Sequence, residues 1–143
     1  MEHAIEWEEK YSVDVPELDE CQKELFAKFN TLIELKTDKA DAKTLTNMIS
    51  DINDYSKMYF SKEERILRKR KYPDLETHSK AHRQFIKNSI SLRREIAEDV
   101  NNLTMEIILE LRDWLFDHIE TSDALYVPFL RIHQYIDDAA KKS

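Results

Sequence analysis

The chain has 143 residues, of which 41% are hydrophobic and 36% charged, and its net charge is −7. This balance fits one soluble domain with a buried core, and the negative charge disfavours non-specific binding to nucleic acid. Glycine is absent and proline occurs three times, which argues against hairpins and favours long helices with simple loops.

The sequence gives no indication of a membrane span, because no run of about 18 apolar residues is present. Its first seven residues lack the basic and apolar regions of a secretory signal. The single cysteine, Cys21, rules out an intrachain disulfide framework. Together these features predict a cytoplasmic protein.

The N-terminal third is predicted to hold an irregular arm and one helix. The arm covers residues 1–16 and ends at Pro16, a residue that suits the start of a helix. The first helix is expected over residues 17–36, because apolar side chains recur there at steps of three and four. Its inner positions are Leu18, Gln22, Leu25, Phe26, Phe29, Leu32 and Ile33.

Two further helices are expected over residues 43–71 and 75–99, separated by Tyr72 and Pro73 because proline ends a helix. On the earlier helix, Tyr59 and Glu63 fall one turn apart on the inner face. The inner stripe of the later helix is otherwise mostly apolar, yet it contains two histidines. Its positions are Leu75, His78, His82, Phe85, Ser89, Leu92 and Ile96.

The fourth helix is expected over residues 102–120, and Asp123 lies just past its last turn. The positions of its inner stripe are Val100, Thr104, Ile107, Leu111, Trp114, His118 and Thr121. A short C-terminal helix should follow over residues 127–140. No repeat or second domain is visible, so residues 1–143 are predicted to form one domain. The expected fold is all-α: an up-and-down four-helix bundle with an irregular N-terminal arm and a short C-terminal helix.

Polar residues interrupt all four inner stripes, and in an antiparallel bundle these interruptions meet at one end. They are Gln22, Tyr59, Glu63, His78, His82 and His118, with Asp123 at the same end. Three imidazoles and two carboxylates suit iron, manganese or zinc. The alternative is a metal-free layer of histidine–carboxylate pairs, in which five titratable groups would have to satisfy one another.

Segments across nearly the whole chain resemble the hemerythrin family, including its single-domain bacterial members. They are Trp7 and Tyr11, Leu18-Asp-Glu-Cys-Gln-Lys-Glu-Leu-Phe26, Tyr59-Phe-Ser-Lys-Glu-Glu64, Tyr72-Pro73, His78-Ser-Lys-Ala-His82 and Trp114-Leu-Phe-Asp-His-Ile-Glu-Thr-Ser-Asp123. The resemblance implies a non-haem di-iron site in a four-helix bundle. It implies that His78, His82 and His118 bind one iron, while Glu63 and Asp123 bridge to the second.

The sequence departs from the family pattern at the second iron, whose two terminal ligands are histidines in the family. Gln22 and Tyr59 stand at those positions. The second metal is therefore expected to be absent, weakly held or differently bound. A Tyr59 phenolate could still bind ferric iron, whereas the amide of Gln22 is a poor ligand. Alternatively, these two side chains fill the core and share a hydrogen bond.

The resemblance predicts a non-haem iron protein that binds O2, or a related small ligand such as nitric oxide or peroxide, for carriage, storage or sensing. One or two iron ions per chain are expected, with manganese or zinc as possible replacements. Oxygen binding in the family takes one electron from each of two irons, so a lone iron puts ordinary oxygen carriage in question. One alternative is a degenerate bundle with one structural metal or none, and another is an enzyme acting on peroxide or nitric oxide. We expect a binding protein rather than an enzyme.

Overall fold

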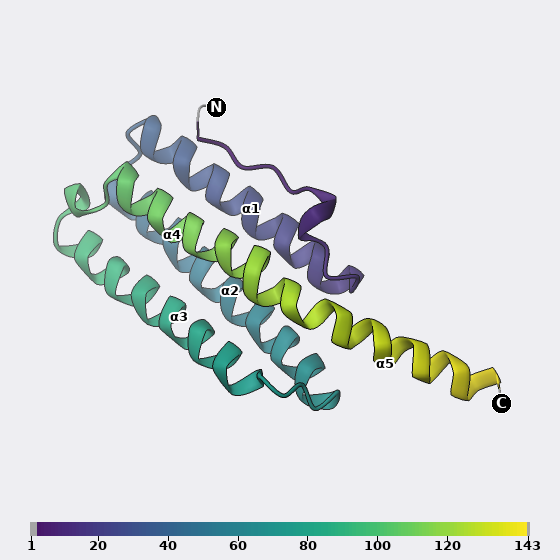
Figure 1. The fold of residues 1–143 in the computed structure, drawn as a ribbon. Coiled ribbons are helices and arrows are strands. Elements are labelled where there is room, and N and C mark those ends of the chain that lie inside the picture. The colour runs from purple at the N-terminus through teal and green to yellow at the C-terminus, as the bar shows by residue number, and fades with distance from the viewer. Residues whose placement is uncertain (1–2, 143) are drawn as a thin grey trace.

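The computed structural model describes residues 3–142 and confirms the all-α fold, with no strand in the described part of the chain. Four helices form an antiparallel up-and-down bundle (Figure 1). A fifth helix and three short elements complete the chain. The elements are η1 (Glu9–Tyr11), α1 (Pro16–Thr37), α2 (Ala42–Lys69), α3 (Leu75–Glu98), η2 (Val100–Asn102), α4 (Met105–His118), the π-helical turn η3 (Ile119–Asp123) and α5 (Ala124–Lys142). None of the described helices is long and apolar enough to cross a membrane.

The helices begin where the local sequence satisfies their free N–H groups. Pro16 opens α1, where a missing N–H costs nothing. The Asp41 carboxylate caps α2 by accepting a hydrogen bond from the Thr44 N–H at 2.8 Å. The Thr104 hydroxyl caps α4 in the same way, accepting from the N–H of Ile107 at 3.1 Å. Capping at these sites fixes where each helix enters the bundle.

The ends of α1 and α2 show how a chain without glycine closes its helices. Lys39 and Lys71 adopt φ angles of 59° and 57°, the left-handed conformation that glycine usually takes after a helix. The next N–H in each case turns back to the helix, from Ala40 to the carbonyl of Leu35 and from Tyr72 to that of Leu67, both at 2.9 Å. These closures stop α2 at Lys69, two residues before the predicted end.

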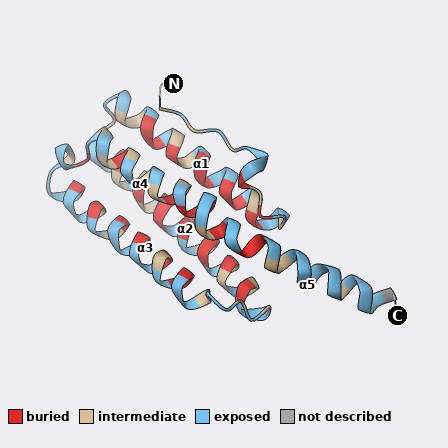
Figure 2. Cartoon of the chain, in the orientation of Figure 1, coloured by how far each residue is buried: buried red, intermediate tan, exposed pale blue. Residues whose placement is uncertain are grey.

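The core lies between the inner faces of the four helices, which carry the buried residues in Figure 2. Every predicted inner position of α1 is buried, and so is every predicted position of α3 except the half-buried Leu75. The predicted stripe of α4 is wrong in part, because Ile108 and Leu115 are buried while Ile107 and Leu111 are half-buried. That helix is apolar on nearly every side, so periodicity alone leaves its inner face ambiguous.

The predicted break between the fourth helix and a short terminal helix is also wrong. The chain continues from α4 through η3 into α5 without a loop, and Pro128 lies inside α5. Proline inside a helix removes one backbone hydrogen bond and crowds the carbonyl four residues before it, which costs stability but does not end this rod. The far part of α5 extends beyond the bundle (Figure 1). The four exposed large apolar side chains of the described chain are all on α5: Leu125 near its start, and Ile132, Tyr135 and Ile136 in the far part.

From residue 3 to residue 15 the N-terminal arm is irregular, as predicted, except for the short turn η1, and residues 1 and 2 of the predicted arm lie outside the described residues. It lies along α1, where Asn30 makes two hydrogen bonds of 2.8 Å with the backbone of Ile5. The indole of Trp7 donates a hydrogen bond to the side-chain oxygen of Gln22 at 2.8 Å. The arm therefore reaches the polar end of the bundle core.

Candidate metal centre

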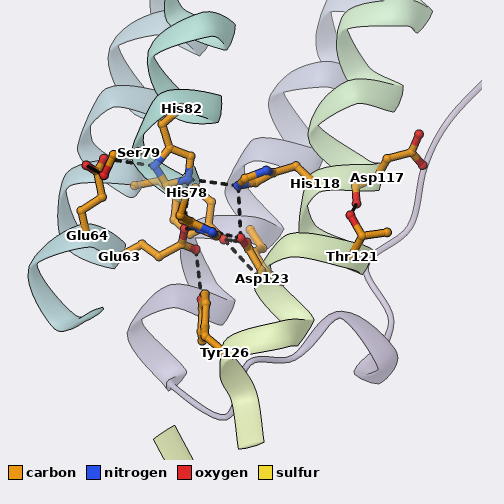
Figure 3. Close-up of polar contacts among 12 residues, drawn as sticks. Glu63, Glu64, His78, Ser79, His82, Asp117, His118, Thr121, Asp123 and Tyr126 are labelled. Carbon is orange, nitrogen blue, oxygen red and sulfur yellow. Dashed lines mark hydrogen bonds and ion pairs between the residues drawn. The ribbon is translucent and has the colours of Figure 1, made fainter. Parts of the chain in front are cut away.

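Five side chains from three parts of the bundle converge at one buried point near the exit end of α4. Glu63 comes from the last turns of α2, and His78 and His82 come from the first turns of α3. His118 ends α4 and Asp123 ends η3. One ligand atom from each of the five lies within 4.8 Å of all the others. Figure 3 shows the five side chains pointing toward one another.

The π-helical turn explains how His118 and Asp123 reach the same point. Residues five apart on an α-helix point in directions about 140° apart, since each residue turns the chain by about 100°. In η3 the wider i→i+5 turn brings the fifth residue back toward the face of the first. Asp123 therefore faces the bundle interior and is fully buried.

The spacing of the converging nitrogen and oxygen atoms is that of a metal shell. The Nε2 atoms of His82 and His118 are 3.0 Å apart, and His82 Nε2 is 3.0 Å from Glu63 Oε1. Asp123 Oδ1 lies 3.1 Å from His78 Nε2 and 3.2 Å from His118 Nε2. Neighbouring ligands on an octahedral ion with bonds of about 2.1 Å are about 3.0 Å apart. The donor set therefore fits a metal ion.

One buried oxygen of the cluster has ion-pair contacts with two histidines but no hydrogen bond of good geometry. Asp123 Oδ1 accepts no hydrogen bond of good geometry from any described residue, although buried polar atoms are nearly always paired. Leaving such an acceptor unsatisfied costs about 1–3 kcal/mol, and more when it is charged. A cation bound among the five side chains would remove this cost.

Aromatic rings and an outer carboxylate hold the imidazoles in place. The ring of Phe60 stacks on that of His82 with centroids 3.9 Å apart, and Trp114 stacks on His118 at 5.0 Å. Glu64 Oε2 lies 3.0 Å from Nδ1 of His82, and Glu64 also accepts a hydrogen bond from Ser79. A carboxylate on the far nitrogen leaves Nε2 free to bind a metal. Helical periodicity did not indicate this role for Glu64, because its partner His82 is 18 residues away on another helix.

The two residues at the altered positions lie beside the cluster and contact each other. The Gln22 amide donates a hydrogen bond to the Tyr59 hydroxyl at 3.3 Å. That hydroxyl donates in turn to Asp123 Oδ2 at 2.9 Å. Both side chains are fully buried. Tyr59 thus donates its hydrogen bond to the Asp123 oxygen that does not contact His78 or His118.

A second phenol, that of Tyr126, donates a hydrogen bond to the carboxylate of Glu63. The hydroxyl of Tyr126 donates a hydrogen bond to Glu63 Oε2 at 3.0 Å, and the Tyr126 side chain is fully buried. The sequence analysis missed this residue. Its position three residues after Asp123 on one helix face was the available signal, but it depended on a helix continuing past residue 120.

The electrostatics of the cluster favour charged imidazole–carboxylate pairs when no cation is bound. Burial alone lowers the pKa of His78, but its contacts with Asp123 and Glu63 outweigh burial and raise that pKa to about 10. Burial raises the pKa of Asp123, and its contacts with His118 and His78 more than reverse this, so the carboxyl stays ionised. Burial, and then the charge on the neighbouring carboxylates, raises the pKa of Tyr59 and of Tyr126 well above 10, so both phenols stay protonated donors.

This fold and site define a helical bundle protein with a buried metal-binding centre, and comparison with known proteins gives its family. The sequence pattern described as "Hemerythrin HHE cation binding domain" matches residues 13–130. The chain therefore belongs to the hemerythrin family. It is a metal-binding, hemerythrin-like protein.

Curated relatives and a solved structure agree with this assignment. The chain is 28% identical to a myohemerythrin of Theromyzon tessulatum over 121 residues, which cover 85% of this chain and 89% of the relative. It is 26% identical to a bacteriohemerythrin of Stenotrophomonas maltophilia over 129 residues, covering 89% and 82% of the two chains. A crystal structure of wild-type hemerythrin shares the fold with a TM-score of 0.79 and 23% identity, covering 87% of this chain and 95% of its own.

Proposed function

We propose that this chain is a non-haem iron protein that binds O2 or a related small ligand, such as nitric oxide or peroxide, at one iron. His78, His82, His118, Glu63 and Asp123 would hold that iron. The observation that carries the proposal is the approach of five donor atoms to within 4.8 Å. Iron in this family supplies the electrons and the binding position for the small ligand. Five protein donors would leave one position of a six-coordinate ion for it.

The two phenols support an altered or lost second metal site. In the family pattern the far oxygens of both carboxylates face the second iron. Here Tyr59 and Tyr126 donate hydrogen bonds to those oxygens. A protonated phenol is a poor ligand, and a carboxylate oxygen that accepts its hydrogen bond is less available to a second ion. Similarity in sequence is therefore not sufficient to propose that this chain binds oxygen reversibly as the di-iron members of the family do.

A cavity beside His78 supports the binding of a small ligand. A cavity of about 310 Å³ lies at the end of the bundle between α3 and the start of α5, with Thr77, His78, Ala81, Ser122 and Leu125 among its lining residues. Only 5% of His78 is exposed, and it is exposed in this direction. The lining is mixed: Thr77, Ala81 and Ser122 are small, Leu125 is apolar, and Tyr72 and Asp74 complete the wall. The volume is sufficient for a diatomic molecule.

Metal content per chain is the first test, measured by elemental analysis of untagged protein purified without added metal. About one iron per chain, whose ferrous spectrum changes when nitric oxide is added, supports the proposal. About two irons would overturn the altered second site and favour the di-iron chemistry of the family. No metal in a folded chain would leave a metal-free polar layer, and one metal that is indifferent to nitric oxide, O2 and peroxide would indicate a structural ion.

A designed pair of variants tests the role of the altered positions. Gln22→His/Tyr59→His restores both family ligands and should raise the iron content from about one to about two, with the optical bands of an oxygenated di-iron site. The matched control is Tyr59→Phe, which removes only the hydroxyl and should leave the content unchanged. If the double variant folds and still binds one iron, Gln22 and Tyr59 do not stand at the second site.

A further inference from the structure

A long groove follows the outer side of the bundle between α2 and α3. It has a volume of about 560 Å³. Its apolar lining comes from Phe60 on α2 and from Ile86 and Ile90 on α3. Both isoleucines are half-buried, and Phe60 is 3% exposed. The groove therefore offers apolar surface that the chain itself leaves partly uncovered.

Four cations line this groove, although the whole chain carries a net charge of −7. They are Lys57 on α2 and Arg83, Lys87 and Arg94 on α3. Arg83 pairs with Glu76 at 3.1 Å in an exposed contact. The other three form no ion pair with any described residue. The one acidic lining residue, Glu64, already contacts Ser79 and His82. The groove therefore has unbalanced positive charge beside apolar surface.

The spread of these charges indicates the kind of occupant. Arg83 and Arg94 are 11 residues apart on one helix, which separates them by about 16 Å. A fatty acid has one carboxylate and would meet cations at one end only. A nucleic acid backbone would meet the cations but has no apolar face to place on the isoleucines. An acidic amphipathic helix carries apolar side chains on one face and carboxylates along both flanks, so it matches the whole length.

We propose that the groove between α2 and α3 is the docking site for an acidic amphipathic helix of a partner protein. About 11 residues of such a helix would span the four cations. Its apolar positions at i, i+3, i+4 and i+7 would contact Phe60, Ile86 and Ile90. Its flanking Asp and Glu side chains would meet Lys57 on one side and Lys87 and Arg94 on the other.

The groove also touches the metal centre. His82 and Glu64 line the groove near Phe60, whose ring stacks on the His82 imidazole at 3.9 Å. A docked helix would therefore cover the contact between Glu64 and His82. A partner bound there would lie directly against residues of the metal centre. The docking itself rests on the groove and its charges, not on the proposed iron chemistry.

A pair of synthetic peptides tests the docking. The first is a fluorescein-labelled 18-residue helical peptide with leucine at the four apolar positions and glutamate on both flanks, and the second has lysine in place of every glutamate. Fluorescence anisotropy with the full chain, with and without metal, should show saturable binding of the acidic peptide that weakens as salt is raised. The lysine peptide should not bind. Equal binding of both peptides, or binding of neither, would overturn the proposal.

Variants of the chain locate the site. Lys57→Glu/Lys87→Glu/Arg94→Glu should weaken binding of the acidic peptide roughly tenfold or more, because three favourable contacts become repulsive. Lys36→Glu/Lys39→Glu/Lys141→Glu changes the net charge equally at the far ends of α1 and α5, away from the groove, and should leave the affinity within about twofold.

The apolar lining and the rival ligand need their own measurements. Ile90→Ser should weaken the acidic peptide without changing the circular dichroism of the chain. Dodecanoate titrated in place of the peptide distinguishes a lipid-like acid: if it binds in the groove while the acidic peptide does not, the helix proposal is wrong. Loss of affinity in the far-end variant as large as in the groove variant would also overturn it.

Discussion

The stability of the metal-free chain should fall as the pH rises from 6.5 to 9. In the folded chain His78 keeps its proton up to a pKa of about 10, against an ordinary value of 6.5. A group with a raised pKa in the folded state contributes its full stability below the unfolded value and loses it as the pH approaches the folded value. Each pH unit in that interval costs about 1.4 kcal/mol, so the loss from pH 6.5 to 9 is about 3 kcal/mol.

Urea unfolding of the chelator-treated chain at pH 6.5, 7.5 and 9 measures this loss. His78→Gln should remove most of it, whereas His133→Gln on α5 should preserve it. Zinc-loaded chain should not lose stability over the same range, because a bound metal requires neutral imidazoles. Equal stability of the metal-free chain at pH 6.5 and 9 would refute the argument that carboxylates hold His78 protonated.

Three further predictions concern the frame around the centre. Lys39→Gly should stabilise the chain by about 1 kcal/mol, because glycine adopts a positive φ without strain, while Ala27→Gly inside α1 should cost about 1 kcal/mol. Thermal melting compares the two variants. A loss of stability in Lys39→Gly would contradict the assigned helix end. Phe60→Ala should cost about 3–5 kcal/mol of unfolding free energy and Ile132→Ala less than about 0.5; equal effects in urea titrations would contradict the burial of Phe60. Cys21, which is 4% exposed and whose pKa is raised by burial, should react with a thiol reagent far more slowly in buffer than in urea, and similar rates would place it at the surface.

The sequence by itself was sufficient for the class of fold and for the end of the bundle where the polar residues meet. The inner faces of α1 and α3 could be predicted because most apolar side chains recur on one face with the period of a helix, and polar or charged residues fill most of the other face. The histidines and Glu63 fall on such faces, so their convergence follows from the antiparallel order of the helices. Whether residues 1–143 form one domain and where the protein is located stay predictions.

Tertiary structure decided what periodicity could not. The π-helical turn changes the register between His118 and Asp123, and a pattern based on 3.6 residues per turn contains no sign of it. The same turn carries α4 onward into α5 and thereby brings Tyr126 to Glu63. Glu64 and the groove cations lie on the outer sides of their helices, where charged residues are common. The packing of α2 against α3 brings Glu64 to Ser79 and His82 and leaves three of the groove cations without an ion pair among the described residues. Local sequence sets which face of a helix is apolar, whereas contacts between residues far apart in the chain depend on how the helices are packed.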